Sequence, residues 1–276
     1  MTTSRIVLGL VTLVAVGSAA CDVRVNDKGG VSLDISEGGR AEDESTQMYS
    51  LAKGGQIEVQ TENANIHLVA ATGAGIEVQT QRYARAKTDE AARELLKQEF
   101  STVEATPARL VIRSVRKEGF DFRQRVRVSY RISVPAGGAV SIKNENGMVR
   151  FEKVDGSLVV RSTNSRIEGE GVSGGVDFET VNGSVMVAMN SVTRDVRIRT
   201  VNGGVVLSLP LHATLNASVE ASAVNGGVSI DDALPLKTTT KDRQRVAGTL
   251  GTGSGPRIEL QTTNGGVRLD VRAGLR

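Results

Sequence analysis

The stretch TVNGSVMV, residues 180–187, returns twenty residues later as TVNGGVVL, residues 200–207. Asn-Gly between apolar residues is a strong signal for a tight β-hairpin turn. The same letters at a fixed spacing indicate instead a stacked repeat, in which each copy packs on the next one. The two alternatives give different folds, so the spacing of further copies decides between them.

Six asparagines mark copies of this motif along the chain. The intervals between them are 18, 18, 20, 23 and 39 residues. The residues six and four positions before each asparagine are apolar, the residue two positions before it is small or polar, and the third residue after it is Val or Ile. Alternation of apolar and polar residues on both sides of a turn indicates two half-buried strands. The six corner residues are Asn146, Asn164, Asn182, Asn202, Asn225 and Asn264. An earlier copy runs from Ile57 to Leu68.

A second corner lies between the asparagines, at VDG (154–156) and VSG (172–174). One period therefore contains a strand, an Asn corner, a second strand and a Val corner. Because a hairpin meander needs no constant period, we predict an all-β fold, a parallel β-solenoid (β-helix) with rungs of about 18–20 residues. Stacked Asn and Thr side chains should form ladders along the rungs. The tolerance of Gly and Asn for positive φ is sufficient to explain each Asn-Gly corner, so the asparagines receive a structural role and no binding role.

The N-terminus resembles a bacterial lipoprotein signal. One arginine precedes the apolar run IVLGLVTLVAVG (6–17), and SAAC follows it; the run is too short to span a bilayer. We predict a signal peptide over residues 1–20 and lipidation of Cys21, the single cysteine of the chain. Ser18 stands where such signals usually have Leu, so export without lipid remains the alternative. Asp22 resembles an inner-membrane retention signal of some Gram-negative bacteria.

The remaining chain divides into three segments. Residues 21–47 are polar and predict a tether. Residues 48–138 predict a β-rich segment containing one helix at 88–100, which Thr88 caps and which covers an end or flank of the solenoid. Residues 139–276 predict the repeat itself, with a polar excursion at 232–255 that breaks the period. The expected apolar face of the helix is formed by Ala91, Ala92, Leu95, Leu96 and Phe100.

The composition offers little for catalysis. The chain has two histidines, 3 % aromatic residues and a net charge of +3 with both signs interleaved, so no basic stripe for nucleic acid is present. No metal-ligand spacing, phosphate loop or nucleophile elbow occurs. We therefore predict no catalytic residue, no metal and no cofactor. A carbohydrate-active β-helix enzyme is the alternative, but the outward charges Arg161, Glu179 and Arg199 alternate in sign between rungs, which favours structural pairing.

A family resemblance rests on VSYRISVPAGGAVSIKNENGMVRF (128–151) and VRIRTVNGGVVLSLP (196–210). These segments resemble bacterial adhesin-like, β-strand-repeat domains of unknown function, well over 126–230 and loosely over 57–115. The resemblance implies an exported β-solenoid and no catalytic residues. We expect a lipid-anchored cell-envelope protein, periplasmic or on the outer surface, with an adhesin-like binding or structural role. A periplasmic signalling or structural module is the alternative.

The residue before each Asn corner points outward by the same alternation. Three of these residues are valines, and outward apolar residues also follow two of the corners. They form a candidate surface for an envelope protein or for self-association, unless another segment covers them. The surface consists of Val181, Val201, Val224, Met186 and Val206.

Overall fold

The computed structural model describes residues 38–52, 54–73, 75–116, 126–210 and 215–272, without the side chains of 98–100 and 115–116. Within them lie sixteen strands and one helix, so the prediction of an all-β fold with one short helix is confirmed. The predicted signal peptide and Cys21 lie outside the described residues. The predicted tether is wrong at its end, because residues 40–47 belong to an eleven-residue strand, β1. Their alternating exposure, hidden by the polar composition, marks them as a strand.

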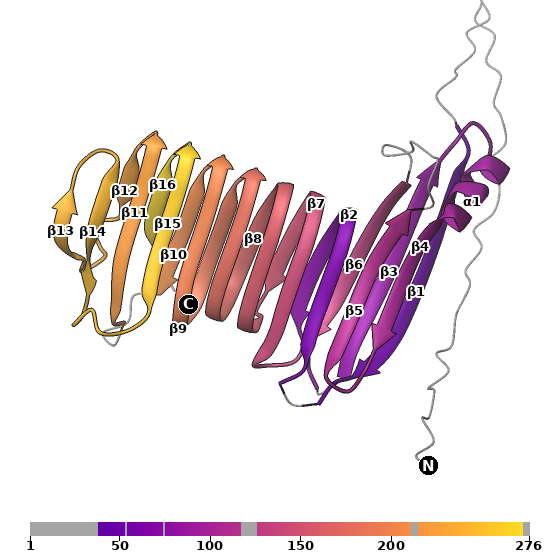
Figure 1. Cartoon of the computed structure of the whole chain (residues 1–276), viewed down its shortest axis with the longest axis horizontal. Coiled ribbons are helices and arrows are strands. Elements are labelled where there is room, and N and C mark those ends of the chain that lie inside the picture. The colour runs from indigo at the N-terminus through magenta and orange to yellow at the C-terminus, as the bar shows by residue number, and fades with distance from the viewer. Residues whose placement is uncertain (1–37, 53, 74, 117–125, 211–214, 273–276) are drawn as a thin grey trace, which may run out of the picture.

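The elements follow in chain order (Figure 1). They are β1 (Arg40–Ser50), β2 (Gln56–Ala70), β3 (Gly75–Arg85), α1 (Asp89–Gln98), β4 (Glu99–Ala105), β5 (Arg109–Arg116), β6 (Val126–Val134), β7 (Gly138–Glu152), β8 (Asp155–Asn182), β9 (Val185–Asn202), β10 (Val205–Pro210), β11 (Ala217–Asn225), β12 (Val228–Ile230), β13 (Lys237–Lys241), β14 (Arg245–Leu250), β15 (Arg257–Asn264) and β16 (Val267–Arg272).

The strands form two layers, because several of them continue through an Asn corner. Residues before the corners make layer A, in the order β4-β5-β2-β7-β8-β9-β15-β11-β14-β13. Residues after the corners make layer B, in the order β1-β3-β6-β2-β7-β8-β9-β10-β16-β12. The pairing is parallel in the middle of each layer and antiparallel at the outer strands, except at β12, which pairs with β16 in parallel. Neither layer closes on itself.

The core lies between the layers and follows the predicted alternation. All twelve apolar residues at the two positions before the six corners are buried. Phe151 of layer B stacks on Phe178 of layer A, with ring centroids 5.2 Å apart and an angle of 11° between the planes. Val154 and Val172 of the second corner are fully buried. The period-two pattern therefore identified the inward face of each strand.

The order of the rungs differs from the order of the sequence. β15 pairs with β9 on one side, where Ile258 faces Val196, and with β11 on the other, where Ile258 faces Val219. In layer B, β16 likewise lies between β10 and β12. The last rung of the chain thus fills the position that the spacing assigned to Asn225. Figure 1 shows this yellow strand between two orange ones.

The segment that breaks the period accounts for this insertion. Residues 232–255 contain β13 and β14, which form an antiparallel hairpin beside β11. The chain then returns and adds β15 on the opposite edge of β11. The sequence interval of 39 residues between Asn225 and Asn264 consequently joins neighbouring rungs and skips none.

The helix packs on the strands at the other end of the stack and, among the described strands, leaves the edge of β1 open. Ala92, Leu95 and Leu96 pack against Ala41 of β1 and Ala84 of β3, which begin the layer B order. The Thr88 hydroxyl accepts the N–H of Ala91 at 3.2 Å, as an N-cap does. These findings confirm the predicted cap and the covering role of the helix. Ala91 is exposed, contrary to prediction, and α1 ends at Gln98, before Phe100.

Candidate functional site

The predicted asparagine ladder runs along the whole stack of rungs. Each Asn Nδ2 donates to the Asn Oδ1 of the neighbouring rung at 2.7–2.8 Å, and Asn63 of the earlier copy continues the ladder. The order is Asn63, Asn146, Asn164, Asn182, Asn202, Asn264 and Asn225. The side-chain amides thus hydrogen-bond to one another, which supports the structural role assigned to the asparagines.

The predicted positive φ is present at three of the glycines that follow a corner asparagine, Gly147, Gly183 and Gly265, but it does not explain every corner. Among the described residues no asparagine has positive φ, and Gly203 does not have it either. A Cβ on Gly203 would lie 2.0 Å from the carbonyl oxygen of Gly183 on the next rung. Close approach between the backbones of adjacent rungs, and not turn conformation, therefore requires glycine here.

The threonines two positions before the corners hold the corners from inside. Thr200 Oγ1 donates to the Gly183 carbonyl at 2.9 Å, and Thr262 Oγ1 donates to the Gly203 carbonyl at 2.8 Å. The predicted ladder between threonines is wrong, because the hydroxyls of Thr180, Thr200 and Thr262 bond to the backbone of the next rung. Buried carbonyls need such hydrogen-bond partners. The sequence pattern had identified these positions as small or polar, but it did not predict that their hydroxyls bond to the backbone.

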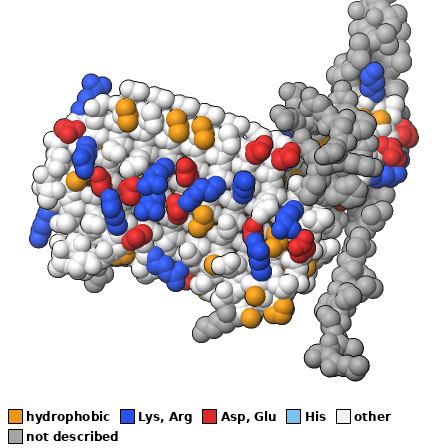
Figure 2. All heavy atoms as spheres, viewed as in Figure 1, with side chains coloured by type: hydrophobic (Ala, Val, Ile, Leu, Met, Phe, Trp, Pro, Cys, Tyr) orange, Lys and Arg blue, Asp and Glu red, His pale blue; other side chains and the backbone are white. Residues whose placement is uncertain are grey.

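The corners present a row of exposed valines. Val181 and Val201 are each 40 % exposed and Val224 is 60 % exposed. Val181 and Val201 lie side by side, because the residues flanking them are paired between adjacent rungs. Thr263 separates Val201 from Val224, since β15 lies between their strands. Figure 2 shows isolated hydrophobic side chains along the upper rim of the molecule. We call Val181, Val201, Thr263 and Val224 the corner row.

The other two residues of the predicted surface do not belong to the corner row. Met186 and Val206 face each other in layer B and are half-buried. On the neighbouring strands they meet Glu168 and Arg268. The structure therefore brings together three of the five predicted residues, in a row interrupted by one threonine. The hairpin β13–β14 does not bury the row: Gln244 donates to the Val224 carbonyl while the Val224 side chain stays exposed.

The outer face of layer A carries a band of alternating charge, visible in Figure 2. Arg161 binds Asp177 at 2.6 Å and lies 3.4 Å from Glu179. Glu220 binds both Arg245 and Arg257 at 2.8 Å. These contacts confirm charge pairing between rungs. Carboxylates that already bind arginines are poorly placed as the acid and base of a glycosidase.

Glu259 is the most enclosed charge of this band, with 6 % exposure. Its carboxylate lies 2.7 Å from Arg199, 3.4 Å from Arg197 and 3.9 Å from Arg257. Burial pushes the pKa of Glu259 upward, but the hydrogen bonds and charges of the two nearer arginines outweigh it, and the pKa lies below its usual value. Because β15 is inserted between β9 and β11, Arg197 is paired with Glu259 and not with Glu220 of the next strand in sequence order.

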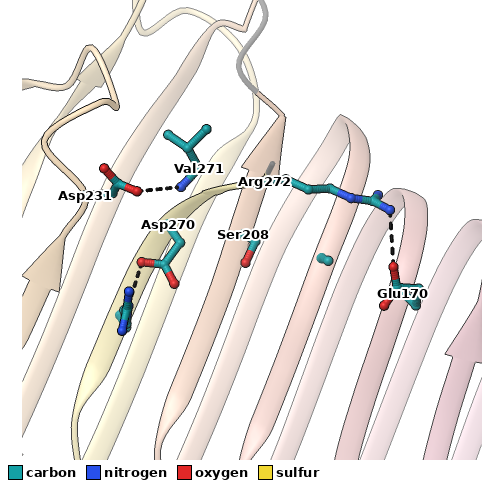
Figure 3. A pocket seen from close by; sticks show the side chains of 8 residues that line it. Glu170, Ser208, Asp231, Asp270, Val271 and Arg272 are labelled. Atoms are coloured by element: carbon teal, nitrogen blue, oxygen red, sulfur yellow. Dashed lines mark hydrogen bonds and ion pairs between the residues drawn. The ribbon is translucent and has the colours of Figure 1, made fainter. Parts of the chain in front are cut away.

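A shallow polar hollow of about 320 Å³ lies on layer B near the last strand (Figure 3). Ala188 and Ser208 are among the residues that line it, and Arg272 reaches across it to Glu170 at 3.4 Å. Asp231 at its rim accepts the N–H groups of Ala233 and Val271, which lower the pKa of its carboxyl. Arg268 binds Asp270, Arg272 binds Glu170, and no histidine is among the residues that line the hollow, so it lacks the parts of a nucleophilic site.

The two histidines of the chain are possible metal ligands. His67 points outward from β2, with Nδ1 3.0 Å from Arg131 and Nε2 3.3 Å from Glu152. Burial and Arg131 lower its pKa. His212 lies outside the described residues. Within the part of the chain that the structure describes, no cluster of His, Cys, Asp or Glu could hold a metal ion, and no helix is long and apolar enough to cross a membrane.

A family model described as Toastrack DUF4097 matches residues 42–270. The chain belongs to the Toastrack DUF4097 family. Its predicted membership of an adhesin-like β-repeat family of unknown function is thereby confirmed. No curated protein matches the chain. The match begins in β1, the strand that composition had assigned to the tether.

Three of the solved structures that are similar to this Toastrack chain carry names from cell adhesion. A candidate cell adhesion protein from Clostridium sporogenes is 10 % identical, with a TM-score of 0.46 over 84 % of this chain and 100 % of that one. A candidate adhesin from Bacteroides fragilis is 10 % identical, with a TM-score of 0.37 over 83 % and 97 %. One from Parabacteroides distasonis is 9 % identical, with a TM-score of 0.35 over 82 % and 97 %.

Proposed function

We propose that this Toastrack protein is an exported cell-envelope lipoprotein with a non-catalytic, adhesin-like binding role. The observation that carries the proposal is the contrast between two surfaces. The charged side chains of layer A are engaged with one another, whereas the valines of the corner row are exposed on a regular scaffold. Exposed apolar residues with a polar rim are typical of interaction sites.

The proposed scaffold is a parallel β-solenoid with rungs of 18–20 residues. Its support is the bonding between asparagines that are 18, 18 and 20 residues apart, together with parallel pairing of β7, β8 and β9. Such a scaffold keeps corner residues at a fixed spacing of about 4.8 Å between rungs. Its rigidity limits the entropy lost when a partner binds.

The proposed anchor is a lipid on Cys21, which would tether the scaffold to a membrane. Radiolabelled palmitate tests it directly. We expect incorporation into the wild-type protein and its loss in Cys21→Ala. Absence of label, or label that survives the substitution, contradicts the anchor and leaves an exported protein with a free thiol.

The proposed binding surface is the corner row, and its partner is an envelope or surface protein. We expect Val201→Asp to abolish capture of the partner while the melting temperature changes little, because the side chain is 40 % exposed. Thr163→Asp is the matched control: it occupies the same position of another rung, is exposed, and lies outside the valine pair. Equal loss of capture in both variants, or wild-type capture in Val201→Asp, contradicts the proposal.

A second candidate is a structural or signalling module held in the periplasm. Asp22 favours it, because the residue after the lipidated cysteine resembles an inner-membrane retention signal. Protease treatment of intact cells separates the candidates. An outward adhesin is cut, whereas a periplasmic module is protected until the outer membrane is permeabilised.

A further inference from the structure

The strands at the two ends of the β-stack, β13 and β1, differ in how readily their open edges could pair with another strand. At one end of layer A, β13 has five residues, begins and ends with Lys, and pairs with β14 through a register shift. Short length, lysines and irregular pairing each discourage the addition of another strand. At one end of layer B, β1 has eleven residues, contains no Lys or Pro, and pairs with β3 in uninterrupted register from Arg40 to Ser50.

The backbone hydrogen bonds identify the groups on the open edge of β1. Antiparallel neighbours alternate between bonded and non-bonded pairs. The N–H of Ala86 donates to the Gly39 carbonyl, so odd-numbered residues of β1 bond to β3. The N–H of Arg40 turns away from β3 and donates to the Asp89 carboxylate. The amides of the following even-numbered residues therefore face away from β3, and no other described strand pairs with β1.

We propose that β1 is the docking edge for a second copy of the chain, paired antiparallel about a two-fold axis at Thr46. This register overlaps residues 42–50 of both copies. It places Thr46 opposite Thr46, Glu44 opposite Met48 and Glu42 opposite Ser50. Cross-strand threonine pairs are favourable, and Met48, which is 59 % exposed, gains cover from the aliphatic part of Glu44.

Charge favours this register over the one centred on Glu44. Centring the pair two residues earlier would set Glu44 against Glu44, and like charges directly opposite are destabilising. Asp43 is already bound by Arg82 of β3 and adds no unpaired charge to the edge. A two-fold contact needs one self-complementary segment, and β1 supplies it with its acidic half facing its neutral half.

Proline at position 46 tests the docking edge. Thr46→Pro removes an N–H that faces the open edge and leaves the bonds to β3, as proline on edge strands does. Thr46→Val keeps that N–H and is the matched control. We compare the full chain carrying Cys21→Ala by sedimentation equilibrium. We expect a dimer for the parent and Thr46→Val, and a mass lower by half for Thr46→Pro. A monomeric parent, or a Thr46→Pro dimer, overturns the proposal.

Hydrogen exchange of the parent chain covers the case in which proline unfolds β1. The amide of Met48 should exchange more slowly as protein concentration rises, because the second copy protects it. Protection that is equal at all concentrations would show that a segment of the same chain covers β1, and would overturn the proposal. The corner row lies elsewhere, so Val201→Asp should leave the mass of this dimer unchanged.

Discussion

Ile198→Asp tests the inward alternation of the rungs, from which the rest of the structure follows. Ile198 has 0 % exposure and lies between Phe178 on β8 and Leu260 on β15. Loss of the buried isoleucine costs about 2–3 kcal/mol. A buried aspartate must also be protonated at pH 7, and raising its pKa from about 3.9 past 7 costs about 4 kcal/mol.

The sum of about 6–7 kcal/mol compares with a typical domain stability of about 5–15 kcal/mol. We therefore expect Ile198→Asp to be unfolded or nearly so. Val201→Asp, three residues along the same strand, should lose no more than about 1 kcal/mol. Urea unfolding followed by far-UV circular dichroism measures both. Equal midpoints for the two variants would refute the assignment of inward and outward positions.

Three further outcomes follow from the contacts. Gly203→Ala should lower the melting temperature far more than Gly204→Ala, because the new Cβ lies 2.0 Å from a carbonyl oxygen in the first case and 3.5 Å in the second; equal losses would contradict the close approach of the rungs. Glu259 has a lowered pKa despite its burial, so its stabilising effect is present above its unfolded pKa of about 4.3 and is lost as pH falls through the folded value. Thermal melts should show the gap between wild type and Glu259→Gln closing in acid, and a gap independent of pH would count against the ion-pair cluster. His67 has a pKa lowered mainly by burial, so the unfolded chain binds the proton more readily and the free energy of unfolding falls as pH drops below about 6.5. His67→Gln should flatten this part of the plot of stability against pH, and an unchanged plot would contradict the lowered pKa.

The sequence predicted those features that depend on local alternation. The twelve core positions before the corners, the buried Val154 and Val172 and the Asn ladder follow from periods of two and of 18–20 residues. Periodicity describes one rung and its neighbours, so it specifies local structure well. The charge pairs along layer A followed for the same reason.

Rung order could not be predicted, because identical rungs offer equivalent edges. The apolar residues and the asparagine of β11 fit β9 and β15 equally well, since both strands present Val or Ile and Asn at the same positions. The charged position favours the wrong neighbour, because Glu220 would face Arg197 on β9 but faces Glu259 on β15. The hairpin β13–β14 occupies the other edge of β11 and leaves one position for the last rung. The insertion of β15 between β9 and β11 therefore depends on tertiary structure, and it explains why Thr263 interrupts the valines of the corner row.

The β1 strand was missed because the inward residues at its centre are polar. Asp43, Ser45 and Gln47 alternate with exposed residues, yet none is apolar. Full-length pairing with β3 and the contact of Ala41 with α1 support the strand instead. Composition alone therefore suggested a tether.

Cysteine cross-linking tests the inserted rung most directly. In a Cys21→Ser background we introduce Val201→Cys with Thr263→Cys, or Val201→Cys with Val224→Cys. Adjacent rungs lie about 4.8 Å apart, within the Cα separation of about 4.4–6.8 Å that a disulfide spans. Rungs two steps apart lie about 9.6 Å apart, beyond that reach. We expect oxidation to close the 201–263 pair and to leave the 201–224 pair as thiols, measured by mass spectrometry. A disulfide between 201 and 224, with free thiols at 201 and 263, would contradict the rung order.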